Sequence, residues 1–196
     1  MFLQGIKVNI RSLTRQDLLN IVKWKSDPEI ADLVRGGPIH TSIEIENKRF
    51  ERSIDFSDIM RLMIETKQKK AIGFISLGDL DKDNKKAELG MMIGEKDFWD
   101  HGYGTDALIT LLDYLFNTLE FNRIGLEVFD YNLRAKKTYE KIGFKVEGIQ
   151  RQGLYRANKL HDIYIMGILR DEFEAPSENL SRAAVEKVKK RVHNTR

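Results

Sequence analysis

The stretch from residue 102 to residue 119 most constrains what this chain can fold into. Apolar side chains recur there at helical spacing and share one wide stripe: Ala107, Leu108, Leu111, Leu112, Leu115, Phe116 and Leu119. A helix with so wide an apolar stripe has to be buried against another layer of structure. Strands are predicted on both sides of it, at residues 87–93 and at residues 123–129. The chain therefore needs a sheet that this helix covers.

The same kind of pattern places the other elements. Before residue 87 we predict a strand at 6–13, a helix from Thr14 to about Lys25, a short helix after Pro28, a polar helix at 41–52 and a hairpin of strands at 59–65 and 71–80. After residue 129 we predict a helix from Asn132 to Lys141, a short strand at 144–148 and a longer, interior strand at 160–169. This order indicates an α/β fold, a mixed sheet with helices on both faces.

Charge divides the chain into two parts. Residues 1–173 hold 27 basic and 27 acidic residues, because six of the 33 Lys and Arg and three of the 30 Asp and Glu lie from Glu174 onward. The net charge of +3 therefore belongs to the tail, and the body has no basic face of the kind that binds nucleic acid. We expect one domain at 1–173 and an appended basic helix or tail at 174–196. The tail is either a solvated helix or a contact for a subunit or an anionic surface.

Some residue types and patterns are missing, which excludes several kinds of site. The chain has no cysteine, so disulfides, thiolate zinc sites and a cysteine nucleophile are excluded. Its histidines, at positions 40, 101, 161 and 193, lack metal-ligand spacing, and we expect no metal. No apolar run approaches the roughly 20 residues of a membrane span, and the N-terminus has no signal-peptide core. We expect a cytoplasmic protein without a membrane partner.

The loop before the long helix holds two glycines, Gly102 and Gly104. Glycine lets the backbone pass close to a ligand, and the first amides of a helix have no partner inside it. Such amides and the helix dipole can bind an anion, although a glycine pair on its own more often marks a tight turn. The loop lacks Gly-Lys-Ser/Thr and an acidic residue about 20 positions further on, so it does not match the P-loop or dinucleotide-binding patterns.

A second polar pair lies on the helix that follows residue 129. Asn132 is a good N-cap, and Tyr139 follows on nearly the same face, about 10 Å further along the helix. The starts of the two helices are expected at the same edge of the sheet. Taken alone, Asn132 is a cap and Tyr139 fills the core under an amphipathic helix.

Together these segments resemble the GNAT superfamily of acyl-CoA-dependent N-acetyltransferases. Residues 99–104, Trp-Asp-His-Gly-Tyr-Gly, are similar to its Gln/Arg-x-x-Gly-x-Gly/Ala pyrophosphate loop. Its Asn-x-x-Ala-x-x-x-Tyr-x-x-x-Gly-Phe element is matched without a gap by Asn132, Ala135, Tyr139, Gly143 and Phe144. Residues 87–90 and the region from Glu147 to Asp162 resemble the RimJ/RimL-like branch, which acetylates protein N-termini and other amines. The resemblance covers residues 6–172.

The resemblance implies a fold and an activity. The fold would be a GNAT-type mixed, mostly antiparallel sheet, splayed between two parallel strands, with helices on both faces. The activity would be transfer of the acetyl group of acetyl-CoA to a primary amine in a ternary complex. Acetyl-CoA, the co-substrate, would lie where the strands at 87–93 and 123–129 diverge, and no metal would be needed.

The resemblance also assigns roles to residues. The pantetheine arm would pair with the backbone of Met91, Met92 and Ile93, and the pyrophosphate would bind the amides of His101, Gly102, Tyr103, Gly104 and Thr105. Asn132 would bond the pantetheine arm, and Lys136 is placed with these cofactor-binding residues. Tyr139 would point its hydroxyl at the thioester sulfur. Trp99 departs from the wider superfamily, and Asp100 would weaken cofactor binding unless its carboxylate points away or caps the helix.

These residue types suit amine acetylation. An amine with a pKa near 10 has to lose a proton before it attacks, and direct attack on a thioester needs no enzyme nucleophile. Tyr139 would donate a proton to the leaving thiolate, and a strand amide near Met92 would stabilise the oxyanion. Glu88 is the candidate base, directly or through a water, its alternative being a solvated strand residue. His161 and Asp162 are interpreted as structural.

The sequence leaves the acceptor open between a protein N-terminus, a polyamine, an amino sugar and an antibiotic amine. The region at 24–52, which forms the acceptor wall in this family, contains acidic residues that would attract a cationic amine or are simply solvated: Asp27, Glu29, Asp32, Glu44 and Glu46. Two other hypotheses are a non-catalytic acyl-CoA-binding or sensing module and a nucleic-acid binder that uses the tail. A homodimer is also compatible with the sequence.

Overall fold

Eight strands form one sheet in the computed structural model, which describes residues 1–35, 41–55 and 59–174. The order across the sheet is β1-β2-β3-β4-β5-β6-β8-β7. β5 and β6 run parallel, and the other neighbours are antiparallel. The strands are β1 (Phe2–Gln4), β2 (Val8–Ser12), β3 (Met60–Thr66), β4 (Ala71–Asp81), β5 (Lys86–Ile93), β6 (Arg123–Phe129), β7 (Lys145–Arg156) and β8 (Lys159–Leu169).

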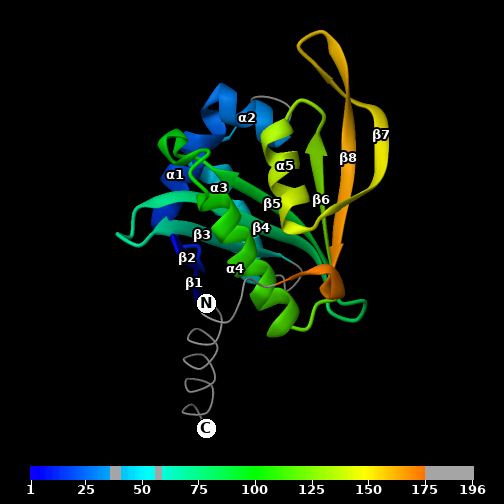
Figure 1. Cartoon of the computed structure of the whole chain (residues 1–196). Coiled ribbons are helices and arrows are strands. Elements are labelled where there is room, and N and C mark those ends of the chain that lie inside the picture. The colour runs from blue at the N-terminus through cyan, green and yellow to red at the C-terminus, as the bar shows by residue number, and fades with distance from the viewer. Residues whose placement is uncertain (36–40, 56–58, 175–196) are drawn as a thin grey trace.

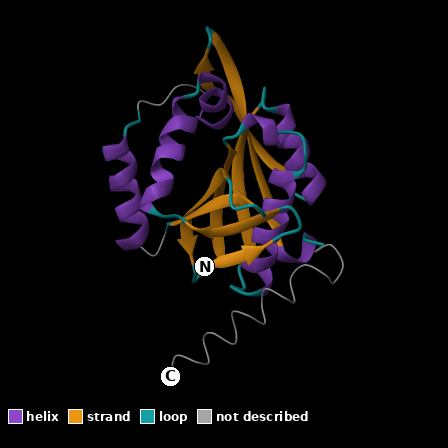
Figure 2. Ribbon diagram, turned by 90° about the vertical axis from the view of Figure 1, so that its left-hand side faces the viewer, coloured by secondary structure: helices purple, strands orange, loops and turns teal. Residues whose placement is uncertain are grey.

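Helices cover both faces of this sheet (Figures 1 and 2). They are α1 (Leu18–Ser26), α2 (Pro28–Arg35), α3 (Ile43–Asp55), α4 (Tyr103–Asn117) and α5 (Leu133–Ile142), with short 3-10 turns at Arg15–Asp17, Lys96–Phe98 and Arg170–Glu172. The apolar residues of α4 and α5 belong to one core with β2–β6 and β8, whereas α1, α2 and α3 pack with Met63, Phe74 and Met92 in a second core. The predicted mixed sheet with helices on both faces is confirmed.

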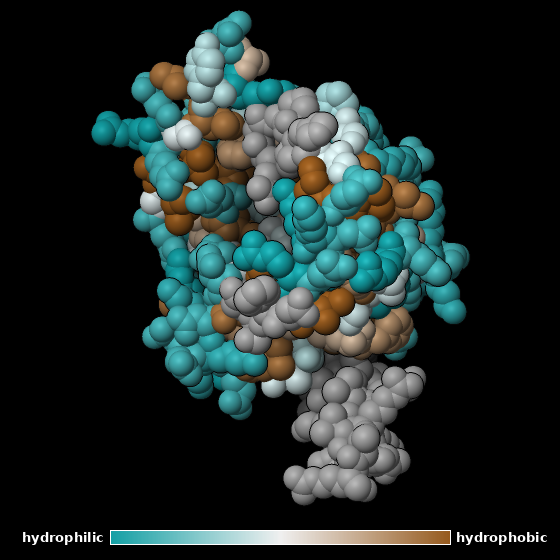
Figure 3. Space-filling model, turned by 180° about the vertical axis from the view of Figure 1, so that it is seen from behind, coloured by the Kyte–Doolittle hydropathy of each residue, from teal (hydrophilic) through white to brown (hydrophobic). Residues whose placement is uncertain are grey.

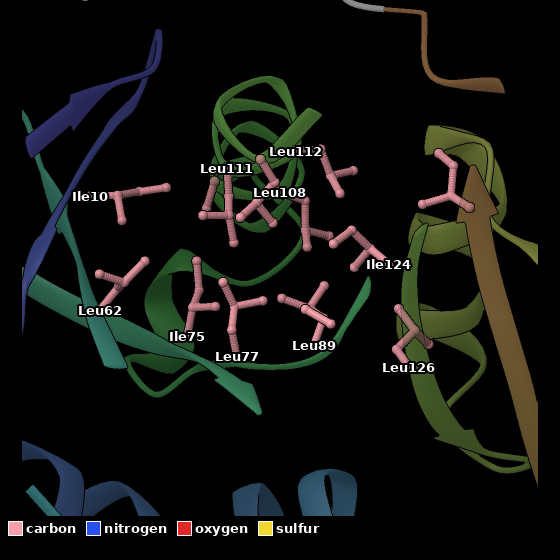
Figure 4. Close-up of a cluster of buried hydrophobic side chains, with 14 of the residues drawn as sticks. Ile10, Leu62, Ile75, Leu77, Leu89, Leu108, Leu111, Leu112, Ile124 and Leu126 are labelled. Atoms are coloured by element: carbon pink, nitrogen blue, oxygen red, sulfur yellow. The ribbon is translucent and has the colours of Figure 1, made fainter. Parts of the chain in front are cut away.

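The wide apolar stripe of α4 fills the larger core. Leu108, Leu111 and Leu112 are fully buried and point toward the strands, where Ile75, Leu77, Leu89 and Ile124 meet them (Figure 4). Burial of each such side chain contributes roughly 1.5–3 kcal/mol. This packing fixes the position of α4, and therefore of the loop at its N-terminus, relative to β5.

The strand predicted at 6–13 is confirmed as β2, but the sequence analysis missed β1 and predicted β7 too short. β1 and β2 form a hairpin around the turn at 5–7, and the carboxylate of Asp106 on α4 accepts hydrogen bonds from the amides of Ile6, Lys7 and Val8 in that turn. The short strand predicted at 144–148 continues to Arg156, because β7 pairs with β8 through two irregularities of register. The other elements predicted within the described residues match within a few residues.

The β7–β8 ribbon extends beyond the helices (Figure 1). Seen from behind, apolar residues reach the surface on that side of the molecule (Figure 3), and the exposed ones of this ribbon include Val146, Ile149, Tyr155 and Leu160. Within the described ranges no helix is both long and apolar enough to cross a membrane. Of the predicted tail at 174–196, the structure describes Glu174 alone, so the predicted appended helix lies outside the described residues.

Candidate active site

β5 and β6 are paired over only three positions. Residues 86–88 pair with residues 123–125, and beyond them the two strands diverge. β5 stays paired with β4 as far as Ile93, and β6 stays paired with β8 along its whole length. The edges of β5 after Glu88 and of β6 after Gly125 therefore face a gap instead of each other. The predicted splay between the two parallel strands is confirmed.

A cleft of about 440 Å³ occupies this gap. Both diverging strands, the start of α4, one face of α5 and the end of α2 line it. The predicted site residues that line it are Met91, Met92, Ile93, Gly102, Gly104, Thr105, Asn132 and Tyr139, whereas the side chains of Glu88, His101, Tyr103 and Lys136 do not. On the β5 wall, the carbonyl of Ile93 already accepts a hydrogen bond from the Trp99 indole at 2.8 Å.

The loop at the start of α4 presents free amides to the cleft. Gly102 is the N-cap of α4 with φ of 80°, a left-handed conformation that favours glycine. The amides of residues 101–105 donate no hydrogen bond to any residue that the structure describes. The Lys7 ammonium donates to the carbonyl of His101 at 2.8 Å, which adds a positive charge beside the loop. Free amides, the dipole of α4 and this lysine together suit a phosphate group.

Arg134 completes the cationic rim of the cleft, and the sequence analysis missed it. Its guanidinium lies 3.9 Å from the centre of the Trp99 ring and 3.5 Å from the carboxylate of Asp100. Asp100 is thus paired with a cation, which reduces the expected repulsion between its carboxylate and a phosphate. Lys137 and Lys141 also line the cleft. The spacing of positions 134, 137 and 141 on one helix face is the signal that could have found this rim.

Asn132 caps α5 and also joins it to α2. Its side-chain oxygen accepts the amide of Ala135 at 3.3 Å, and its amide group donates to the carbonyl of Leu33 at 3.0 Å. Tyr131 makes a parallel contact, because its hydroxyl donates to the carbonyl of Asp32. These bonds hold the end of α2 as a wall of the cleft.

Tyr139 has a buried ring and an unpartnered hydroxyl. The ring packs on Phe144 with a centroid separation of 5.6 Å and forms part of the larger core. Its hydroxyl makes no hydrogen bond with any residue in the described part of the chain, while the side chain lines the cleft. Burial raises the pKa of Tyr139 to about 12, so the phenol keeps its proton at neutral pH. The group is therefore available as a hydrogen-bond and proton donor inside the cleft.

Two carboxylates flank the closed end of the gap. Glu88 lies beside Gly125 and burial, above all, raises its pKa, with smaller contributions from Asp79 and Glu127 and opposition from Arg123. Glu127, which the sequence analysis did not single out, lines the cleft from β6. Glu88 pairs with Gly125, and alternate residues of a strand share a face, so Glu88, Met92 and Glu127 lie on one face of the sheet. Met92 packs with α1, α2 and α3, and we call this the α1–α3 face.

The acidic residues expected to attract a cationic amine are mostly neutralised by neighbours. Asp27 and Glu29 both pair with Lys96, and Asp32 pairs with Arg156 on β7. Glu46 is fully buried among three cations, and Glu44 is exposed. Four of the five carboxylates are thus paired with cations in the described structure, which weakens their attraction for a cationic amine.

Lys136 and His161 have structural partners. Lys136 pairs with Glu140 and lies over the ring of Tyr164, away from the cleft. His161 contacts the carboxylate of Asp130 at 2.9 Å, and Asp162 accepts the amide of Gln152. In the described ranges no three His, Asp or Glu side chains gather as metal ligands would.

Comparison with known proteins assigns the family. Residues 7–145 match the family model of the acetyltransferase (GNAT) domain. The chain is 39% identical over 102 residues to a Bacillus subtilis protein named "Putative ribosomal N-acetyltransferase YdaF", a match that spans 52% of this chain and about half (55%) of that relative. It is 26% identical over 172 residues to the spermidine N(1)-acetyltransferase of Vibrio cholerae, covering 88% of this chain and 98% of that protein.

A solved structure extends this likeness to the fold. The crystal structure of the spermidine N-acetyltransferase from Vibrio cholerae in complex with CoA and spermine aligns with a TM-score of 0.79 and 25% identity, covering 85% of this chain and 97% of that chain. The family match, the splayed strands and the free amides at the start of α4 all point to an acetyltransferase domain. The chain belongs to the GNAT family and is an acetyl-CoA-dependent acyltransferase.

Proposed function

We propose that this protein transfers the acetyl group of acetyl-CoA to a primary amine by direct attack in a ternary complex. The cleft between β5 and β6 carries the proposal, because it leads from the free amides at 101–105 to the hydroxyl of Tyr139. Acetyl-CoA supplies an activated thioester. The chain supplies phosphate-binding amides, a strand edge at Met91–Ile93 and a phenol that keeps its proton.

The proton leaving the amine is assigned to Glu88, through a water molecule, or to Glu127. The raised pKa of Glu88 makes it a better proton acceptor than an ordinary glutamate, but its side chain does not line the cleft. Glu127 does line it. Tyr139 donates to the leaving thiolate, which typically contributes about 10²–10⁴-fold to the rate.

The finer family assignment is also part of the proposal. Residues 87–90 and Trp99 support the RimJ/RimL-like branch. The spermidine acetyltransferases of similar fold support a small amine as the class of acceptor. A cytoplasmic location stays a prediction of the sequence.

An acetyl-CoA consumption screen tests the proposal. Purified protein is incubated with acetyl-CoA and each class of primary amine, and released CoA is measured with a thiol reagent, to which a chain without cysteine adds no background. We expect turnover that depends on the amine and a product of the amine mass plus one acetyl group. Binding of acetyl-CoA without turnover on any amine would instead support the non-catalytic module.

Arg134→Gln is expected to raise the Kd for acetyl-CoA about tenfold, since a charge-assisted contact at the rim is lost. Lys136→Gln is the matched control, because Lys136 lies on the same helix but is paired with Glu140 outside the cleft. Calorimetric titration of both variants measures the effect. A larger loss in Lys136→Gln would restore the original assignment of Lys136 to the cofactor and refute that of Arg134.

A further inference from the structure

A second cavity adjoins the cleft on the α1–α3 face of the sheet. Its volume is about 300 Å³, and it shares Val34, Gly90, Met91 and Met92 with the cleft. Ser76 and Phe74 of β4 also line it. A small molecule seated there would reach the same residues of β5 that the thioester is proposed to approach, from the other side. The cavity is thus placed to hold the acceptor.

The charged side chains that line this cavity in the described structure are all cations. They are Lys25, Arg49, Arg52 and Arg61, and the other lining residues are mostly apolar. The carboxylate of Glu46 accepts hydrogen bonds from three of them, from Lys25 at 2.8 Å, Arg49 at 2.6 Å and Arg61 at 3.0 Å. One carboxylate therefore serves three cations, which leaves a positive charge among the described residues of the cavity.

Arg61 contributes to this positive charge with a hydrogen-bond donor that is left unpaired. The side chain is 6% exposed, and its Nη1 is buried without a hydrogen-bond partner in the part of the chain that the structure describes. Its guanidinium also lies over the ring of Phe74, at 5.5 Å from the centroid. A buried guanidinium nitrogen without a partner is costly, and planar guanidinium groups bind carboxylates and phosphates through two parallel hydrogen bonds. Because Arg61 lines the cavity, this guanidinium with an unpaired donor lies beside any molecule seated there.

The charge reverses toward the cleft. Glu127 lines the cleft from β6, on the same sheet face as Gly90, and Glu88 lies at the closed end of the gap. A molecule that spans the cleft and the cavity would therefore meet negative charge on the cleft side and positive charge in the cavity. This polarity matches an ammonium at one end and an anionic group at the other.

We propose that the acceptor is a small primary amine that carries a carboxylate or phosphate group, which Arg61 and Arg49 bind while the amine faces β5. The inference rests on the proposed acetyl transfer and specifies its substrate class. It separates this chain from the similar Vibrio cholerae enzyme, whose crystal structure contains spermine, a polycation.

A series of four-carbon amines tests the anion directly. Butylamine, 4-aminobutyrate and putrescine share their chain and end in a methyl group, a carboxylate or a second ammonium. O-phosphoethanolamine against ethanolamine forms the phosphate arm, and a peptide with acidic residues at its N-terminus forms the macromolecular arm. We expect kcat/KM for an anionic small amine to exceed that of its neutral partner by about tenfold or more. Faster turnover of putrescine, or of the peptide, overturns the inference.

Two variants locate the effect. Arg49→Gln, at a side chain 39% exposed, and Arg61→Gln, at the buried one, should each reduce the ratio of kcat/KM between anionic and neutral amine about tenfold. Arg15→Gln removes a cation from an exposed pair with Glu51 and should leave this ratio unchanged. Because Arg61→Gln is at risk of misfolding, Arg49→Gln carries the test on its own, and an unchanged ratio in it refutes the assignment.

Failure of the two proposals can be told apart. Turnover without a preference for anionic amines leaves acetyl transfer intact and overturns only the anion site. If no amine is acetylated, the proposed function fails. Binding of an anion in the cavity is then tested by thermal denaturation with O-phosphoethanolamine and with ethanolamine. A rise in Tm with the phosphorylated amine alone, lost in Arg49→Gln, supports the anion site, and equal Tm values refute it.

Discussion

Tyr139→Phe is expected to lower kcat by about 10- to 1,000-fold while the Kd for acetyl-CoA stays nearly unchanged. The ring fills the core beside Phe144, and phenylalanine keeps that packing. The variant removes only the hydroxyl, which has no partner in the described structure and faces the cleft. Stopped-flow or steady-state release of CoA measures kcat, and calorimetry measures the Kd.

Tyr155→Phe is the matched control, because Tyr155 is exposed on β7 and its hydroxyl donates to the side chain of Asn158, away from the cleft. It should retain the wild-type kcat. Since burial raises the pKa of Tyr139 to about 12, titration of the phenol should not limit the rate at or below pH 10. Equal kcat values for Tyr139→Phe and the wild type would remove Tyr139 from the mechanism.

The fold was predictable where a pattern is local. The stripe of α4 and the alternation at 123–129 depend on residues within one element, and both predictions are confirmed, except that α4 ends at Asn117 and leaves the predicted stripe residue Leu119 exposed. The β1–β2 hairpin was missed because its turn is held by Asp106, about 100 residues away along the chain. β7 was predicted too short because most of its residues are exposed and polar, and two register irregularities interrupt its alternation.

The cleft residues at the start of α4 and on α5 were predictable for a similar reason, since Gly102, Asn132 and Tyr139 lie within short motifs. The charge around the proposed acceptor cavity was not, because it depends on which side chains meet in space. The sequence left Glu46 open between attracting a cationic amine and being solvated, whereas the structure buries it under Lys25, Arg49 and Arg61. A count of acidic residues in one segment gives the wrong sign when basic residues from α1 and β3 join them.

Glu46→Gln is expected to destabilise the protein by about 3–5 kcal/mol at pH 7, because it removes the carboxylate that pairs with two buried cations, Lys25 and Arg61. Lys25 can respond by losing its proton, since burial lowers its pKa to about 8. Arg61 cannot, because a guanidinium stays protonated in proteins. Urea denaturation measures the change. Glu51 lies on the same helix as Glu46 and forms an exposed pair with Arg15, so Glu51→Gln should leave stability almost unchanged.

The pH dependence of this difference distinguishes a lost charge from lost packing. Burial alone would raise the pKa of Glu46, but the hydrogen bonds and charges of Lys25 and Arg61 hold it at about 2, below its ordinary 4.5. A carboxylate whose pKa is lower in the folded state stabilises the fold above pH 4.5 and loses that contribution as the pH falls toward 2. The free-energy gap between wild type and Glu46→Gln should therefore narrow between pH 4.5 and pH 2. A gap that stays constant over this range would show that Glu46 stabilises the protein by packing, and the surplus positive charge inferred for the cavity would then lose its electrostatic basis.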